Sequence, residues 1–210
     1  MGNPRLIVCD LGGVLIQYSW ERATAAWAAA ASVDAVRAEA GSYDSVWHAF
    51  EVDAIDERGF FEHLRRRCGH DIDHDSLLAG WNDIYIGANA EVAALLVELR
   101  DAGLRLVAAT NTNLPHQREA SRRFAEDLEV FSTIYSSCEI KERKPDPEFF
   151  ERILAVEGLA PEEAVFIDDL EENVRGAQRV GIGSIHFTGA ADLRVRLRQL
   201  GVVVNAGQDR

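Results

Sequence analysis

The amino-acid sequence predicts an α/β protein with a doubly wound parallel sheet and a helical cap inserted after the first strand. Three observations lead to this prediction. Short apolar runs of strand length alternate with amphipathic helical stretches, a pattern typical of parallel βαβ units. Polar residues follow the ends of these runs. One interval, between the first two apolar runs, is much longer than a single crossover helix requires.

Five apolar runs are expected to form buried strands. Each is bounded by polar residues or glycine and is close to the usual length of a strand, which favours a strand over a helix. The five runs are Leu6–Cys9, Leu104–Ala109, Ile134 and Tyr135 with the residues after them, Val165–Ile167, and Ile182–Phe187.

Helical stretches separate these runs. Residues 90–102 carry apolar residues at helical spacing and stop before Gly103, a typical helix terminator. A second helix is expected to open at Pro145 and Pro147 and to end near Gly158, and a third covers residues 171–180. Strands that alternate with helices in this way predict a Rossmann-like sheet with right-handed crossovers.

The interval after the first strand is the exception to this alternation. Roughly ninety residues separate Cys9 from Leu104, whereas a βαβ unit takes about 30. A structureless loop of that length is uncommon in a compact protein, and residues 20–40 are rich in alanine, a strong helix former. We therefore expect residues 16–88 to form a helical cap and residues 1–15 and 89–210 to form the α/β core. All four tryptophans, Trp20, Trp27, Trp47 and Trp81, fall in the cap, and we expect most of them to fill its core.

The composition narrows the functional class. With 22 Lys and Arg against 35 Asp and Glu, the formal net charge is −13, which argues against a nucleic-acid partner. No apolar run approaches the ~20 residues that cross a bilayer, and the start of the chain lacks secretion and myristoylation signals. The three cysteines lie far apart, so neither a zinc site nor a disulfide framework is expected. These features predict a cytoplasmic protein whose partner is a small molecule and not a membrane. No oligomeric state is predicted.

Polar residues at the strand ends indicate where the chemistry lies. Ligands of open α/β sheets bind beyond the carboxyl ends of the strands. Two adjacent carboxylates at such an edge repel each other unless a cation lies between them. The residues expected to meet there are Asp10, Thr110, Asn111, Lys144, Asp168 and Asp169.

Four segments that contain these residues follow one another along the chain in the order of the four motifs of the haloacid dehalogenase superfamily, which they resemble. The motifs are DLGGVL from Asp10, the Thr110-Asn111 pair, Lys144 within RKPDP, and Asp168-Asp169 followed by Asn173. The resemblance runs from Arg5 to about Phe187, and the insertion after the first motif is where this family places a helical cap. The sequences DLG and TNTN are most similar to a bacterial branch that includes alpha-D-glucose-1-phosphate phosphatases. The phosphatase-like domains of epoxide hydrolases are a related branch.

The resemblance implies a Mg²⁺-dependent phosphatase that acts on a small phosphate ester through an aspartyl-phosphate intermediate. A sugar phosphate such as glucose 1-phosphate is the expected substrate. Asp10 would be the nucleophile, and Thr110 and Lys144 would stabilise the transferring phosphoryl group. The implied metal ligands are Asp10, the backbone carbonyl of Gly12, Asp168 and Asp169, and the implied substrate-binding residues are Gly12, Gly13, Thr110, Asn111 and Lys144.

Gly12 departs from the wider family. Most of its phosphatases carry, two residues after the nucleophile, an aspartate that protonates the leaving group, and general acid–base catalysis is typically worth about 10²–10⁴-fold. A sugar 1-phosphate tolerates this loss because its anomeric leaving group is relatively acidic. Two alternatives stay open: a 2-haloacid dehalogenase-type hydrolase, which needs no metal, and a phosphometabolite-binding module without turnover.

Other polar residues are weaker candidates. His48, His63, His70 and His74 fall in the cap, and the segment from His70 to Asp75 is expected to be a polar loop rather than a metal site. His116 is expected at the surface. Arg194, Arg196 and Arg198 are expected on a solvated face, and Gln17, Tyr18 and Glu51 are candidate substrate contacts from the cap boundary.

Overall fold

A computed structural model describes residues 4–37 and 43–202. The last residues of the predicted 20–40 helix and both chain termini lie outside these ranges. The core is a five-stranded sheet with the order β5-β4-β1-β6-β7, and every neighbouring pair is parallel. This arrangement confirms the predicted fold class and all five predicted strands. The strands are β1 (Leu6–Cys9), β4 (Arg105–Thr110), β5 (Thr133–Ser136), β6 (Ala164–Asp168) and β7 (Gly183–His186).

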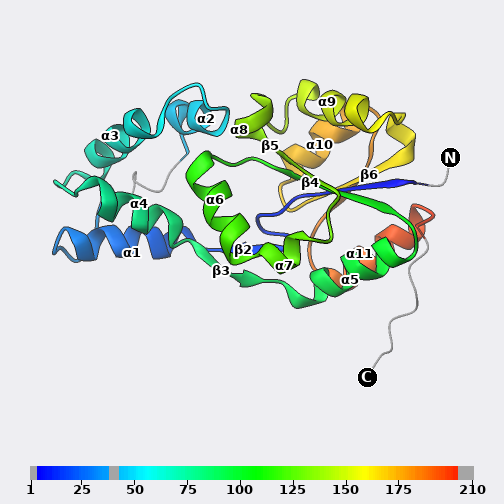
Figure 1. Cartoon of the computed structure of the whole chain (residues 1–210), viewed down its shortest axis with the longest axis horizontal. Coiled ribbons are helices and arrows are strands. Elements are labelled where there is room, and N and C mark those ends of the chain that lie inside the picture. The colour runs from blue at the N-terminus through cyan, green and yellow to red at the C-terminus, as the bar shows by residue number, and fades with distance from the viewer. Residues whose placement is uncertain (1–3, 38–42, 203–210) are drawn as a thin grey trace.

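Helices cover both faces of this sheet (Figure 1). Because side chains alternate along a strand, Leu6 and Val8 of β1 pack into one core cluster, whereas Ile7 and Cys9 pack into another. Helices α9 (Pro147–Glu157) and α10 (Glu171–Arg179) supply the first cluster, and α5 (Ala90–Asp101) and α11 (Ala190–Gln199) supply the second. The central strand is thus buried on both sides, which is why its sequence is a continuous apolar run.

The predicted helix boundaries follow local capping chemistry. The side chain of Asn89 accepts a hydrogen bond from the Val92 N–H at the start of α5. Helix α9 begins at Pro147, a residue suited to the first helical turn, and ends at Gly158, whose φ is +67°. Three further helices follow β4 and β5, namely α6 (Leu114–Arg123), α7 (Ala125–Leu128) and α8 (Ser137–Ile140), and a 3₁₀ turn spans Pro161–Glu163.

A two-stranded antiparallel ribbon leads away from the core and back to it. Its strands are β2 (Ile16–Tyr18) and β3 (Tyr85–Ala88). We expected residues 16–88 to form a helical cap and predicted no strand there, so these two strands are a difference from the sequence analysis. Each is only three or four residues long, and the pairing joins segments far apart in the chain, so neither segment shows a strand pattern by itself. The division of the chain into core and cap stays a prediction.

Along the chain between β2 and β3, the described residues form four helices. They are α1 (Trp20–Ala30), α2 (Ser45–Glu51), α3 (Glu57–Cys68) and α4 (His74–Asn82), and Figure 1 shows them gathered at one end of the molecule. Trp27, Trp47 and Trp81 are at most 2% exposed within their shared aromatic core, which confirms the core-filling role expected for most tryptophans. Trp20 packs against this core and is only partly buried.

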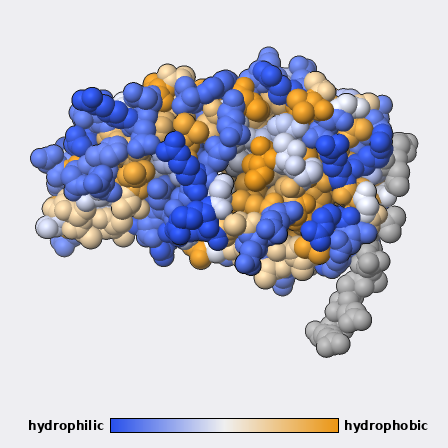
Figure 2. All heavy atoms as spheres, in the orientation of Figure 1, coloured by the Kyte–Doolittle hydropathy of each residue, from blue (hydrophilic) through white to orange (hydrophobic). Residues whose placement is uncertain are grey.

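Hydrophilic residues cover most of the face shown in Figure 2, with hydrophobic residues gathered where the sheet reaches the surface. In the part of the chain that the structure describes, no helix is both long enough and apolar enough to cross a membrane.

Candidate active site

Three aspartates meet at the carboxyl edge of the sheet. Asp10 follows β1 and donates its backbone N–H to the Ile167 carbonyl at 2.8 Å, which places it beside the end of β6. Asp168 ends β6, and Asp169 follows it. One carboxylate oxygen from each aspartate lies within 4.8 Å of the others. We expected from the sequence that these three groups would meet. Among the described residues they are the one cluster of carboxylate, histidine or cysteine side chains that could hold a metal ion.

Lys144 lies between two of these aspartates. Its Nζ is 2.8 Å from Asp10 Oδ1 and 2.7 Å from Asp168 Oδ2, and only 1% of its side chain is exposed. Nζ also lies 5.5 Å from the centroid of the Phe166 ring, a cation–π distance. A buried amine with two carboxylate partners is a fixed positive charge, whereas an isolated lysine on a loop is usually solvated.

Asp168 is held by the protein on both of its oxygens. Oδ1 accepts the backbone N–H of Leu170 at 2.8 Å, and Asn173 Nδ2 lies 3.0 Å from Oδ1 and 3.1 Å from Oδ2. Together with Lys144, these contacts satisfy a carboxylate that is fully buried. The neighbouring Asp169 is partly exposed and lines the cavity beside the site. It is therefore the freer of the two adjacent carboxylates.

Thr110 and Asn111 lie where β4 ends, as the sequence predicted, and both line the cavity. The Asn111 side chain makes two bonds to the backbone of Lys144: Nδ2 donates to the carbonyl at 2.8 Å, and Oδ1 accepts the N–H at 2.9 Å. These bonds position the lysine and engage both polar atoms of the amide. A substrate contact by Asn111 stays a prediction.

The two glycines after Asp10 allow close approach of other side chains. A Cβ on Gly13, whose φ is +74°, would lie 2.1 Å from Asp169 Oδ2, so any larger residue would displace that carboxylate. A Cβ on Gly12 would lie 3.2 Å from Cε1 of Tyr18. The ring of Tyr18 therefore occupies the space into which a side chain at position 12 would point.

The charges at the site do not balance. Burial raises the pKa of Asp10 to about 8, Lys144 opposes this effect, and Asp168 adds to it. Burial by itself lowers the pKa of Lys144, but Asp10 and Asp168 outweigh it, so the lysine pKa is raised and the amine stays charged. Burial also raises the pKa of Asp169, with a further contribution from Asp168. Three carboxylates around one ammonium leave excess negative charge, and carboxylate oxygens are the ligands that Mg²⁺ prefers. Asp10, Asp168 and Asp169 therefore fit a divalent cation.

A cavity of about 600 Å³ opens beside these residues. Asp10, Thr110, Lys144 and Asp169 line one part of it. Much of the rest is formed by the ribbon and by helices α1, α2, α6 and α7. The residues that contribute aromatic rings to its wall are Tyr18, Trp20, Tyr43, Trp47 and Tyr85.

Glu51 of α2 lies at the edge of this cavity and contacts residues far away in the sequence. It is 2% exposed and pairs with Arg143, whose Nε donates to Glu51 Oε2 at 3.0 Å. Ser137 adds a second link, because its hydroxyl lies 2.7 Å from the Glu51 carbonyl. Glu51 and Tyr18 line the cavity, as expected of substrate contacts from the cap boundary, whereas Gln17 is exposed and is not among the lining residues. Their roles toward a substrate stay predictions.

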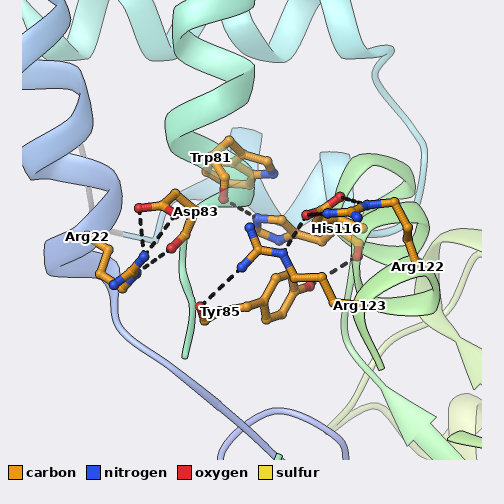
Figure 3. Close-up of polar contacts among 8 residues, drawn as sticks. Arg22, Trp81, Asp83, Tyr85, His116, Arg122 and Arg123 are labelled. Carbon is orange, nitrogen blue, oxygen red and sulfur yellow. Dashed lines mark hydrogen bonds and ion pairs between the residues drawn. The ribbon is translucent and has the colours of Figure 1, made fainter. Parts of the chain in front are cut away.

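His116 corrects one sequence expectation. We placed it at the surface, but it is 5% exposed and stacks on Trp81 with ring centroids 4.6 Å apart (Figure 3). Its Nε2 lies 2.7 Å from the Trp81 carbonyl, and its Nδ1 lies 3.2 Å from Asn113 Nδ2. Burial lowers the pKa of His116 to about 4, so the ring is neutral at pH 7. Helix α6 is polar in sequence apart from a few small residues, which is why the histidine seemed to belong on its solvated face.

Two of the remaining histidines and two of the C-terminal arginines pair with carboxylates. His63 contacts Asp44 at 2.8 Å, and His74 contacts Glu57 at 3.3 Å. The segment before His74 is a loop between α3 and α4, as expected, and His48 lines the cavity. Arg194 pairs with Glu98 of α5, and Arg196 pairs with Asp192.

Sequence reasoning missed several cavity residues, notably Tyr43, Asn113 and Arg143. Arg143 stands next to Lys144 in the sequence, and its position beside a motif was the only available signal. Asn113 follows the Thr110-Asn111 pair and caps α6 by accepting the His116 N–H. Nothing in the sequence near Tyr43 indicates that it faces the cavity.

Comparisons with known proteins agree with this geometry. A family model described as haloacid dehalogenase-like hydrolase matches residues 4–181. A sesquiterpene phosphatase of Aspergillus oryzae is 34% identical over 112 residues, which cover 53% of this chain and 57% of that protein. A D-ribitol-5-phosphate phosphatase of Bacteroides thetaiotaomicron is 21% identical over 206 residues, which cover 95% of this chain and 98% of that protein.

A solved structure extends the likeness. It is a haloacid dehalogenase family enzyme of Bacteroides thetaiotaomicron in complex with magnesium and inorganic phosphate. It superimposes with a TM-score of 0.73 at 27% identity, and the match covers 87% of this chain and 93% of that one. The matches to the first three curated relatives span between 30% and 57% of those proteins.

Proposed function

The chain belongs to the haloacid dehalogenase-like hydrolases, and from this premise we propose that it is a Mg²⁺-dependent phosphomonoesterase acting on a small phosphorylated metabolite. The observation that carries the proposal is the meeting of Asp10, Asp168 and Asp169 around one buried lysine at the carboxyl edge of the sheet. The magnesium and phosphate bound by the related Bacteroides enzyme support it.

Asp10 is the nucleophile in this proposal. Its Oδ1 accepts the Leu11 N–H at 2.7 Å and contacts Lys144 at 2.8 Å, which leaves Oδ2 as the attacking oxygen. Attack on phosphorus breaks the bond to the ester oxygen and forms an aspartyl-phosphate, which water then hydrolyses. The ionised carboxylate needs no separate base, and a divalent cation bound beside it would favour this form against the effect of burial on the pKa of Asp10.

Lys144 and the end of β4 stabilise the phosphoryl group. Before the reaction, two carboxylates hold the Lys144 ammonium and Asn111 holds the backbone of the same residue, and preorganised charge of this kind lowers the cost of reaching the transition state. The Thr110 hydroxyl lines the same part of the cavity and would donate to a phosphoryl oxygen. Asp10, Asp168, Asp169 and the carbonyl of Gly12 would hold Mg²⁺, which when bound offsets the repulsion between the carboxylates and the phosphate.

The finer substrate prediction, a sugar phosphate such as glucose 1-phosphate, belongs to the same proposal. It derives from the motif resemblance, and the similarity to a ribitol phosphate phosphatase supports it. A sugar 1-phosphate also suits a site with glycine at position 12, because its leaving group needs less help from an acid.

The first prediction tests the nucleophile. We expect the wild-type protein to release phosphate from p-nitrophenyl phosphate or from a panel of metabolite phosphates when Mg²⁺ is present. Asp10→Asn should reduce kcat by roughly a thousandfold or more, as removal of other nucleophiles does. Glu172→Gln, which also removes one charge from the cavity wall, is the matched control and should keep most of the activity.

Two results would contradict the proposal. Activity retained by folded Asp10→Asn would remove the nucleophile from its role. Chloride release from 2-haloacids in the presence of EDTA would favour the dehalogenase alternative.

A further inference from the structure

The cavity at the active site continues into an apolar region away from the phosphate end. We call this region the apolar arm. It lies between the β2–β3 ribbon on one side and α6, α7 and β5 on the other. Its walls are the side chains of Ile16, Ile84, Tyr85, Ala120, Leu128 and Ile134. The arm and the Asp10–Lys144 end belong to one continuous cavity, so a single ligand can occupy both.

Several polar groups beside the arm are already bonded within the protein. The Tyr85 hydroxyl donates to the His116 carbonyl at 3.1 Å. Asn113 Oδ1 accepts both the Trp81 Nε1–H and the His116 N–H at 3.1 Å, and His116 Nε2 lies 2.7 Å from the Trp81 carbonyl. The proton of the Tyr85 hydroxyl and both lone pairs of Asn113 Oδ1 are therefore used within the protein, which reduces the number of polar atoms that a polyol could bind there. A hydroxyl buried without a partner is unfavourable, whereas a hydrocarbon group loses nothing there.

The size of the cavity agrees with a ligand larger than a phosphate ion. At about 30 Å³ for each water-sized atom, a volume of about 600 Å³ holds on the order of 20 non-hydrogen atoms. Trp20 and Trp47 also line the cavity, and their rings add flat apolar surface to its wall. Away from Asp10, Lys144 and Asp169, the charged groups of the wall are Glu51 and Arg143, which pair with each other, and Glu172, which is exposed.

The geometry points to a substrate class: the phosphate monoester of an alcohol with an apolar hydrocarbon body, whose phosphate lies against Asp10 and Lys144 and whose hydrocarbon fills the arm. This inference rests on the proposed phosphatase function and names a substrate that competes with the sugar phosphate proposed above, and the experiment below decides between the two. In the overall hydrolysis the bond from phosphorus to the alcohol oxygen breaks. Water supplies the new oxygen on phosphate and the proton on the released alcohol.

A chain-length series tests this inference. The substrates are ethyl, butyl, hexyl and octyl phosphate, compared with glucose 1-phosphate and ribitol 5-phosphate under the same Mg²⁺ concentration. Burial of each methylene contributes ~0.8 kcal/mol, so kcat/KM should rise about fourfold per methylene until the arm is full. A flat or falling series, or a higher kcat/KM for the polyol phosphates, would overturn the inference.

Variants locate the effect in the arm. Ala120→Leu shortens the arm and should abolish the gain in kcat/KM from butyl to octyl phosphate. Ala93→Leu is the matched control. Ala93 is a residue of α5 that packs against the core cluster to which Ala120 belongs, but it does not line the cavity. If Ala120→Leu does not fold, Leu128→Ala widens the arm instead and should favour octyl over hexyl phosphate. An unchanged chain-length profile in the folded variant would contradict the assignment.

A binding measurement separates this inference from the proposed function. Trp20 and Trp47 line the cavity, so their fluorescence should report alkyl phosphates binding to the Asp10→Asn protein. Affinity that rises with chain length, with no hydrolysis by wild type, would support the apolar arm and reject the phosphatase. Hydrolysis by wild type without any chain-length dependence of rate or affinity would keep the phosphatase and reject the arm.

Discussion

Asn173 shows how much one side chain outside the reacting groups can control. Its Nδ2 contacts both oxygens of Asp168, at 3.0 Å and 3.1 Å. The same amide has a buried Oδ1 without a protein partner. The two contacts fix Asp168, and Asp168 in turn holds Lys144 beside Asp10. Asn173 therefore acts through Asp168 and is a positioning residue.

The second prediction concerns this residue. Asn173→Ala should raise the Mg²⁺ concentration needed for half-maximal activity by about 10–100-fold, the usual effect of removing a partner of a metal-binding carboxylate. The measurement is phosphate release against Mg²⁺ concentration. Asn82→Ala is the matched control, because its Oδ1 is also buried and unpartnered but belongs to α4. An unchanged Mg²⁺ requirement in folded Asn173→Ala would show that Asp168 keeps its position unaided.

At the scale of elements, helix α10 sets the position of the turn that carries Lys144. Gly176 lies on the buried side of α10, and a Cβ there would lie 2.5 Å from the Pro145 carbonyl and 3.0 Å from the Phe150 ring. The helix can approach the turn this closely only without a side chain at position 176. The backbone of Lys144 is held from the opposite direction by Asn111.

The third prediction follows from this contact. Gly176→Ala gains about 0.5–1 kcal/mol in helix propensity but loses ~1–3 kcal/mol to overpacking, so the free energy of unfolding should fall slightly. Displacement of the turn should also lower kcat, because a shift of about 1 Å at a catalytic group can reduce the rate by ~10²-fold. Gly87→Ala is the control, since nothing lies within 4 Å of a Cβ at that position. A kcat equal to that of Gly87→Ala would show that the turn absorbs the added methyl group elsewhere.

Across the whole molecule, His116 and Trp81 connect α6 of the sheet region with α4 beyond the ribbon. Figure 3 shows the imidazole next to Trp81, with Tyr85 and Arg123 close by. The hydrogen bond from Trp81 Nε1 to Asn113 Oδ1, at 3.1 Å, is a second link between the same two helices. The packing here requires a neutral imidazole, because a buried charge without a counter-ion is costly.

The fourth prediction is the pH dependence of this connection. Burial lowers the pKa of His116 from 6.5 to about 4, so the unfolded chain binds a proton more readily than the folded one. The stabilising contribution of His116 is therefore complete above pH 6.5 and is lost as the pH falls toward 4, by about 3 kcal/mol. Denaturant unfolding of wild type and His116→Gln across this range measures it. The variant should lack this part of the pH dependence, whereas His70→Gln should retain it.

The sequence by itself determined the sheet and the residues at its edge. Continuous apolar runs such as Val165–Ile167 are typical of strands buried on both faces, and parallel strands bring their carboxyl ends to one edge. That rule was enough to expect Asp10, Lys144 and Asp168 together. The β2–β3 ribbon escaped prediction, because its two short strands gain their stability from pairing with each other and not from any local pattern.

Only the tertiary structure decided which polar atoms remain available and where apolar surface faces a cavity. His116 and Asn111 are polar in sequence, yet their side chains are engaged with Trp81 and with the backbone of Lys144. Ala120 and Leu128 have the spacing of ordinary core residues, yet they line the apolar arm. Hydrophobic periodicity predicts that a side chain is buried. Whether it then packs against protein or lines a cavity depends on elements far away in the chain, and these come together only in the folded molecule.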